Sequence, residues 1–137
     1  MNENAYNIAD NVQTMILRDG NDVLLQVKGF AGKSDNGLVK ILDIKSLQAS
    51  PTHLRLTGMY RAVQTGLTVF LYWEGGEEHD FLTTIEGYGV NSFDWCSAGL
   101  TDTKKEGFTG NVMMRLETES PSPKHFSLVL EFAKQRG

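Results

Sequence analysis

The sequence predicts an all-β protein, an antiparallel β-sandwich of jelly-roll type with about eight strands. Apolar residues recur at a spacing of two in several short segments, and turn-forming residues separate most of these segments. No stretch has the sustained 3.6-residue period of a long helix. Fourteen glycines against three prolines also suit a chain with many tight turns.

The chain of 137 residues has the length of one domain. Residues 1–11 are polar and rich in Asn, so we expect a flexible N-terminal arm followed by a single β-sandwich domain over residues 12–137. Cys96 is the only cysteine, which excludes an intrachain disulfide and fits a reducing cytoplasm.

The charge distribution disfavours a nucleic-acid partner, and the lengths of the apolar runs disfavour a membrane partner. Seventeen acidic and thirteen basic residues give a net charge of -4, and the basic residues are scattered. Nucleic-acid binding needs clustered Lys and Arg, so we expect no nucleic-acid partner. No apolar run approaches the ~20 residues that a membrane-spanning helix needs, so we expect a soluble protein with no membrane partner.

Residues 12–44 contain three predicted strands. Val12–Arg18 and Val23–Phe30 flank a turn at Asp19–Asp22, and the second strand alternates strictly between apolar and polar residues. After a polar loop at 31–37, Leu38–Ile44 also fits one turn of helix, but its β-branched residues favour a strand.

His53–Val63 is predicted to be a further strand, after a break at Pro51. Strict alternation would give this strand two faces. One carries Leu54, Leu56, Gly58 and Tyr60, and the other carries Arg55, Thr57, Met59 and Arg61.

Leu67–Gly89 is predicted to be a β-hairpin around which the rest of the domain is organised. An apolar run ending at Trp73 is followed by a Gly-Gly turn flanked by acids and then by a second run of aromatic and β-branched residues. Beyond it, Val90–Gly110 is predicted to be a long loop with one short strand at Phe93–Cys96. Asn111–Glu117 and His125–Ala133 are predicted to be the last two strands.

Three patterns in the sequence resemble chemical motifs, but none predicts a catalytic or cofactor site. Gly29–Ser34 ends in Gly-Lys-Ser but lacks the earlier glycine and the following helix of a phosphate loop. The acids Glu74, Glu77, Glu78 and Asp80 are interpreted as a solvated hairpin tip rather than a calcium loop. His53, His79 and His125 are too widely separated to predict a zinc site. We therefore expect no enzyme activity, no metal and no cofactor.

Aromatic residues are the most informative feature of the hairpin. Phe70 and Tyr72 point opposite to Val69, Leu71 and Trp73, so both faces of this strand are apolar. Either the strand is central and covered on both sides, or one face is an interface. A third interpretation is a carbohydrate-binding module that uses Trp73, Tyr88 or Trp95 as stacking surfaces.

The order of short motifs resembles that of small virion proteins of tailed bacteriophages. The resemblance covers about residues 23–134 and is strongest over residues 69–116. It is carried by Val69-Phe-Leu-Tyr-Trp73, Asp80-Phe81, Gly87-Tyr-Gly89, Phe93-Asp94, Gly99-Leu100-Thr-Asp102, Gly107-Phe-Thr-Gly110-Asn-Val112 and a closing strand that ends near Lys134.

The resemblance implies a non-enzymatic capsid decoration (cement) protein that binds the outer head surface. Its expected partners are the major capsid protein or other virion proteins and further copies of itself. Its expected location is the virion, with the host cytoplasm during assembly. The loop at 91–110 and the N-terminal arm are the segments expected to reach neighbours. The candidate interface residues are Phe70, Tyr72, Phe93, Trp95 and Phe108.

Overall fold

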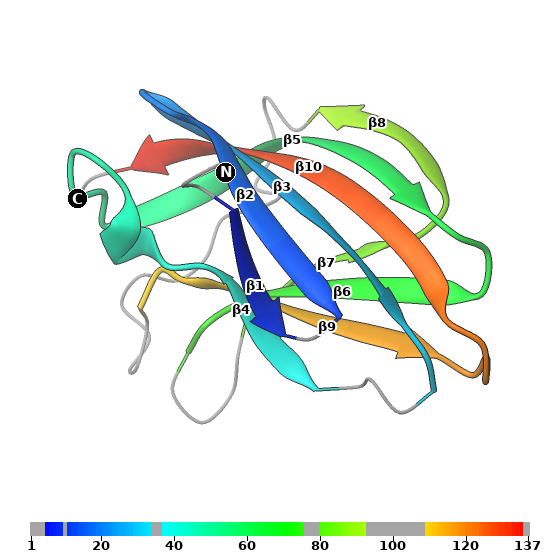
Figure 1. The fold of residues 1–137 in the computed structure, drawn as a ribbon. Coiled ribbons are helices and arrows are strands. Elements are labelled where there is room, and N and C mark those ends of the chain that lie inside the picture. The colour runs from blue at the N-terminus through cyan, green and yellow to red at the C-terminus, as the bar shows by residue number, and fades with distance from the viewer. Residues whose placement is uncertain (1–4, 10, 34–36, 76–79, 93–108, 136–137) are drawn as a thin grey trace.

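The computed structural model describes residues 5–9, 11–33, 37–75, 80–92 and 109–135. Within these residues the chain forms ten strands and one short 3-10 helix, arranged as two antiparallel sheets (Figure 1). The predicted all-β sandwich is therefore confirmed. No helix in this part of the chain is long and apolar enough to cross a membrane.

The larger sheet has six strands in the order β1-β2-β3-β10-β5-β8, and the smaller has four in the order β4-β9-β6-β7. The strands of the larger sheet are β1 (Ala5–Ala9), β2 (Val12–Asp19), β3 (Asp22–Ala31), β10 (Lys124–Gln135), β5 (His53–Val63) and β8 (Tyr88–Ser92). Those of the smaller sheet are β4 (Leu38–Leu42), β9 (Val112–Thr118), β6 (Leu67–Trp73) and β7 (Asp80–Ile85), and the 3-10 helix η1 (Ile44–Ser46) follows β4.

The strand pairing is nested. The innermost pair is β6–β7, and β5 pairs with β8, β4 with β9, and β3 with β10, all antiparallel. From β3 to β10 the chain is thus one long hairpin, with its tip at β6–β7, wound so that successive pairs alternate between the sheets. This is the arrangement of a jelly roll. The predicted hairpin at 67–89 forms its tip through β6 and β7, while β8 crosses to the larger sheet.

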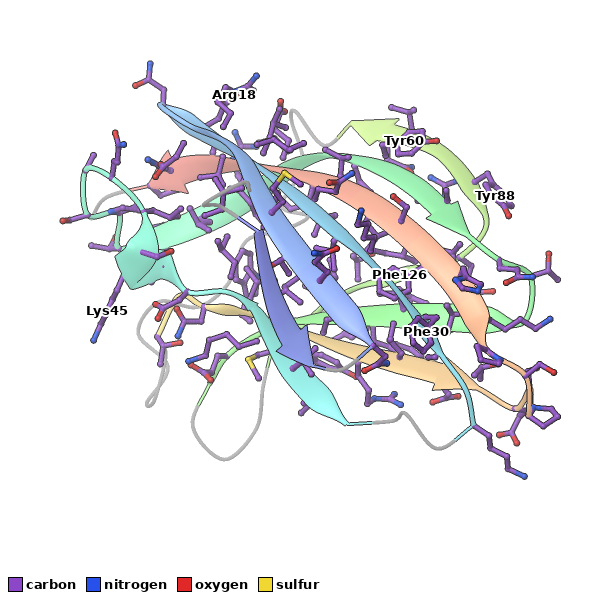
Figure 2. The ribbon with its side chains drawn as sticks, in the orientation of Figure 1. Arg18, Phe30, Lys45, Tyr60, Tyr88 and Phe126 are labelled. Carbon is purple, nitrogen blue, oxygen red and sulfur yellow. The ribbon has the colours of Figure 1, made fainter. Side chains whose placement is uncertain are left out.

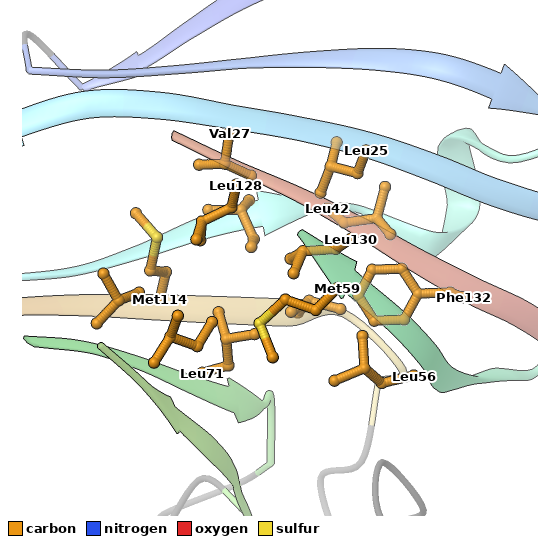
Figure 3. Close-up of a cluster of buried hydrophobic side chains, with 14 of the residues drawn as sticks. Leu25, Val27, Leu42, Leu56, Met59, Leu71, Met114, Leu128, Leu130 and Phe132 are labelled. Carbon is orange, nitrogen blue, oxygen red and sulfur yellow. The ribbon is translucent and has the colours of Figure 1, made fainter. Parts of the chain in front are cut away.

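The core lies between the sheets and follows from the two-residue period. On β10, Phe126, Leu128, Leu130 and Phe132 all point inward and are at most 4% exposed. On β6, Val69, Leu71 and Trp73 face them and are equally buried. Figure 3 shows the cluster, in which Leu71 and Met114 of the smaller sheet lie beneath Leu128 and Leu130. Each sheet has one apolar face, and packing these faces together removes both from water.

A β-bulge corrects the predicted faces of β5. Opposite β10 the register shifts between Glu131, which pairs with Gly58, and Phe132, which pairs with Leu56. Thr57 is the extra residue, and its hydroxyl donates to the Glu131 carbonyl (3.1 Å) and carboxylate (2.8 Å). One extra residue reverses the alternation beyond it. Met59 and Arg61 therefore share the inward face with Leu54 and Leu56, while Tyr60 points to solvent.

The N-terminal segment differs from the predicted arm. Ala5–Ala9 forms β1, which pairs antiparallel with β2, with Ala5 opposite Met15. A polar sequence does not prevent this pairing, because an edge strand is joined by main-chain hydrogen bonds. Two further strand predictions have different outcomes. The strand expected at 38–44 ends at Leu42, and the strand expected at Phe93–Cys96 lies outside the described residues.

Truncating the buried end of β10 should destabilise the fold. The Phe132 ring is fully buried and meets the Trp73 ring edge-on, with centroids 6.2 Å apart. We expect Phe132→Ala to lower the free energy of unfolding by about 3–5 kcal/mol, because it leaves a cavity between the sheets. Urea unfolding followed by tryptophan fluorescence measures this. Phe81→Ala, at a ring that is 59% exposed, is the control and should cost far less.

A glycine should stabilise the turn after η1. Ala49 has φ 65° and Ser50 has φ 48°, so two consecutive non-glycine residues are left-handed. Ala49 is exposed, and glycine adopts this backbone region without a side-chain penalty. We expect Ala49→Gly to raise the melting temperature, with a gain of up to about 1 kcal/mol. Ala62→Gly, within β5, should lower it. A fall for both variants would contradict the strain argument.

Candidate interaction surfaces

Two of the five predicted interface residues lie side by side on the outer face of the smaller sheet. Phe70 and Tyr72 are half-buried, because β6 lies between β9 and β7 and neighbouring side chains cover the rings. The Arg115 guanidinium stacks 4.4 Å above the Phe70 ring, and Tyr72 meets Phe81 edge-on at 5.8 Å. The other three predicted residues, Phe93, Trp95 and Phe108, lie outside the described residues.

Arg115 makes this face less apolar than the sequence suggests. It donates a hydrogen bond to Glu117 (2.8 Å), and the acceptor Glu117, with Tyr72 nearby, raises the pKa of Arg115. The guanidinium therefore carries its full charge while it covers Phe70. The open apolar surface here comes from Phe81, 59% exposed, and from Leu38, 45% exposed and paired with Arg115.

Trp73 does not provide a sugar-stacking surface. The predicted carbohydrate interpretation used Trp73, Tyr88 or Trp95, but Trp73 is 1% exposed and points into the core. Its indole Nε1 finds no acceptor in the structure. The two-residue period explains the burial, since Trp73 shares its face with Val69 and Leu71. Of the remaining two, Tyr88 is 67% exposed and Trp95 lies outside the described residues.

A second apolar surface, not predicted from the sequence, lies on the outer face of the larger sheet at its β8 edge. Its three members are Tyr60 (49% exposed), Tyr88 (67%) and Val90 (76%). Tyr60 pairs directly with Val90, and Tyr88 pairs with Ala62. Figure 2 shows Tyr60 and Tyr88 together beside β8, away from the core. We call these three residues the β8 patch.

Charged residues lie on the same outer face of this sheet. The exposed Lys28 of β3 shares a cross-strand row with Ser127, Ala62 and Tyr88. Arg18 donates two hydrogen bonds to Asp22, at 2.9 and 2.7 Å, and approaches Glu131 at 3.7 Å. The hydrogen bonds from Arg18 lower the pKa of Asp22, so this pair stays charged at neutral pH. The strand β8 itself, Tyr-Gly-Val-Asn-Ser, contains no charged residue.

The described residues include two of the three histidines, His53 and His125, and most of the Gly29–Ser34 segment. No group of three or more His, Cys, Asp or Glu among them could hold a metal ion. His53 pairs with Gln135 at one end of β10, and His125 lies near the other end of that strand, so the two are about 33 Å apart at the rise of a strand. Gly29 lies within β3, where a Cβ would be 2.1 Å from the Asn11 carbonyl oxygen, rather than in a phosphate loop.

The acid at the start of the predicted hairpin tip, Glu74, has a structural role. Its carboxylate accepts hydrogen bonds from Thr109 (2.8 Å) and from the buried Asn111 (2.9 Å). The Asn111 side-chain oxygen in turn accepts from the Ile44 amide (2.8 Å). Glu74 thus joins β6, β9 and η1, while Glu77 and Glu78 lie outside the described residues.

A hollow of about 650 Å³ lies between β2 of the larger sheet and β4 of the smaller. Beside it, Lys134 forms an ion pair with Asp19 and donates to the Gln48 carbonyl (2.9 Å). Asp19 also accepts from the Gln48 amide (3.0 Å). The side chains of Lys134 and Asp19 are only 8% and 17% exposed. These bonds fix the β2–β3 turn to the loop after η1, so the charges have structural partners.

The chain was compared with known proteins. No protein-family model matches it, and no curated protein sequence is significantly similar. The solved structures that resemble it include Fe(II) HppE, with a TM-score of 0.40, and hydroxypropylphosphonic acid epoxidase from S. wedmorenis, with 0.39. Both are 10% identical, and the alignments cover 96% and 95% of this chain but 58% and 56% of those chains. The chain thus spans little more than half of each, and so distant a likeness carries no functional argument.

Removing one partner of the Lys134–Asp19 pair should be costly. Lys134→Met leaves Asp19 buried beside an apolar side chain, and we expect a loss of about 2–4 kcal/mol in the free energy of unfolding. Asp19→Asn should have a similar effect, and the double variant should cost less than the sum of the two. Chemical denaturation of the three variants measures the coupling. Strictly additive losses would show that the two side chains do not interact.

Proposed function

We propose that this chain is a non-catalytic structural protein of a tailed-bacteriophage virion, of the capsid decoration kind. In this role it binds the outer head surface, stabilises the shell and associates with copies of itself. Two things support the proposal: the order of short motifs across residues 23–134, and the presence of an apolar surface outside the core. The observation that carries it is the β8 patch.

The β8 patch has the properties of a protein interface. Tyr and other aromatic residues are enriched at the centres of interfaces, where charged residues are depleted. Tyr60, Tyr88 and Val90 lie together and the strand beneath two of them is uncharged. Soluble proteins usually protect an edge strand with charges, proline or a covering element, because open main-chain groups attract another strand. An uncharged edge carrying exposed Tyr and Val is suited to a partner.

The proposed partners are the major capsid protein or another virion protein, and a second copy of this chain. An antiparallel pair of β8 strands would extend the six-stranded sheet across a two-fold axis and place Val90 near its symmetry mate. A net charge of -4 disfavours contact elsewhere between two copies, so an uncharged edge is the place where repulsion is least. The proposed location is the virion, with the host cytoplasm during assembly.

A second candidate function is carbohydrate binding by a tail or fibre component. The specific observation in its favour is that Tyr60 and Tyr88 are exposed on neighbouring strands, where their rings could stack on a sugar. With Trp73 buried, this candidate rests on tyrosines. Tyr88→Ala would abolish glycan binding. Loss of protein association at the β8 patch would require a more disruptive substitution, such as the introduction of a charge.

A charge placed in the β8 patch should prevent association. We expect light scattering of the wild-type chain to give a mass of at least two 15.2 kDa chains, and Val90→Lys to give one, because lysine at the centre of the edge repels its mate. Leu17→Lys, at a residue 48% exposed on β2, is the matched control and should leave the mass unchanged.

The same variants test binding to the shell. In co-sedimentation with heads of the phage that encodes the chain, wild type and Leu17→Lys should bind and Val90→Lys should not. A wild-type chain that is monomeric and also fails to bind heads would refute the proposal.

A further inference from the structure

The bulge at Thr57 directs the side chain of Arg61 towards the space between the two sheets. Beyond the bulge, Arg61 lies in register with the buried Leu128 of β10, between Met59 and Val63 on the inward face of β5. Strict alternation would have placed it in solvent. Bulges commonly re-aim side chains next to functional sites. Arg61 is half-buried there, so its charged end reaches the opening between the sheets and is accessible to a ligand.

The guanidinium of Arg61 is held in place by the edge strand. Nε donates to the Glu86 carbonyl (3.0 Å), and Nη1 donates to the Asn91 side-chain oxygen. Gly89 is the register partner of Arg61, and a Cβ there would come within 2.8 Å of Nη2. Gly89 also has φ +155°, which disfavours other residues. Glu86, Gly89 and Asn91 therefore fix the position of the Arg61 guanidinium.

The Arg61 guanidinium borders a hollow of about 430 Å³ between the sheets, where β8 faces β7. Its lining consists of Met59, Arg61, Thr83, Thr84, Glu86 and Asn91. The volume is within the range of small-ligand sites. Two of the five guanidinium N–H donors are used by Glu86 and Asn91, and none of the ion pairs among the described residues includes Arg61.

We propose that this hollow binds a small hydroxylated carboxylate, such as a sugar acid or a hydroxy acid. The free N–H groups of a fixed guanidinium match the two oxygens of a carboxylate. The hydroxyls of Thr83 and Thr84 and the Asn91 amide suit the ligand's hydroxyl groups, and Met59 suits its carbon skeleton. Glu86 also lines the hollow and forms no ion pair with Arg61 among the described residues; its negative charge disfavours a phosphate dianion more than a monoanion. This inference does not depend on the assembly role proposed above.

Titration of the full chain with sodium glucuronate, followed by amide chemical shifts, tests the proposal. Glucose is the uncharged control ligand. We expect glucuronate, and not glucose, to shift the amides of Arg61, Thr83 and Asn91 in a saturable way. Arg61→Gln should weaken binding about tenfold or more, because charge-assisted hydrogen bonds are lost. Arg18→Gln removes an exposed arginine on β2 and should leave binding unchanged.

Further arms keep the test decisive. Gly89→Ala retains the arginine but should weaken glucuronate binding by displacing the guanidinium, which serves if Arg61→Gln does not fold. Equal binding by wild type and Arg61→Gln, equal shifts with glucose, or no saturable shift at all would overturn the proposal. A glutamate-containing tripeptide that saturates the site when glucuronate does not would also overturn it, since the carboxylate would then come from a protein chain.

Discussion

Burial of one apolar face from each sheet is the constraint on which the rest of this structure depends. Because side chains alternate along a strand, each inward-pointing residue fixes the direction of its neighbours. The central strand β10 pairs with both β3 and β5, so its alternation determines which of their residues point inward. The nested pairs from β6–β7 outward bring Phe132, Leu128 and Leu71 together in the core. The surface features follow from this arrangement, because each side chain that points into the core leaves its neighbours along the strand pointing to solvent.

Much of the fold could be predicted because the local pattern carries this alternation. His53–Val63 was predicted with the bounds of β5, and the hairpin tip was predicted from its apolar runs and its turn. The faces of β5 could not be predicted, because the extra residue at Thr57 is defined only against Glu131, 74 positions later. For the same reason the pairing of β1 with β2 was missed. Polarity at residues 5–9 is a local signal, whereas the edge of β2 is supplied by the fold.

The candidate sites could likewise be predicted only where they depend on the local sequence pattern. Phe70 and Tyr72 were predicted as surface candidates from alternation alone, and they do lie on an outer face, but the cover provided by Arg115 comes from another strand. The β8 patch was missed because residues 90–110 have no sustained period and were predicted to be loop, while Tyr60 was assigned to the wrong side of its strand. The Arg61 hollow needs the bulge between Thr57 and Glu131 together with Gly89 and Asn91 of β8, and the bulge and β8 are distant in sequence.

One five-residue strand serves both proposed surfaces, and its alternation keeps them chemically separate. Tyr88 and Val90 point outward to the patch, whereas Gly89 and Asn91 lie on the side that holds Arg61. A change at Val90 can therefore disturb association without touching the hollow, and a change at Arg61 can disturb the hollow without touching the patch. The two surfaces remain linked through the β8 backbone, because pairing this edge with a partner would restrain the strand that seats the guanidinium. Ligand binding and assembly would then favour each other by ordering the same strand, without any direct contact between the ligand and the partner.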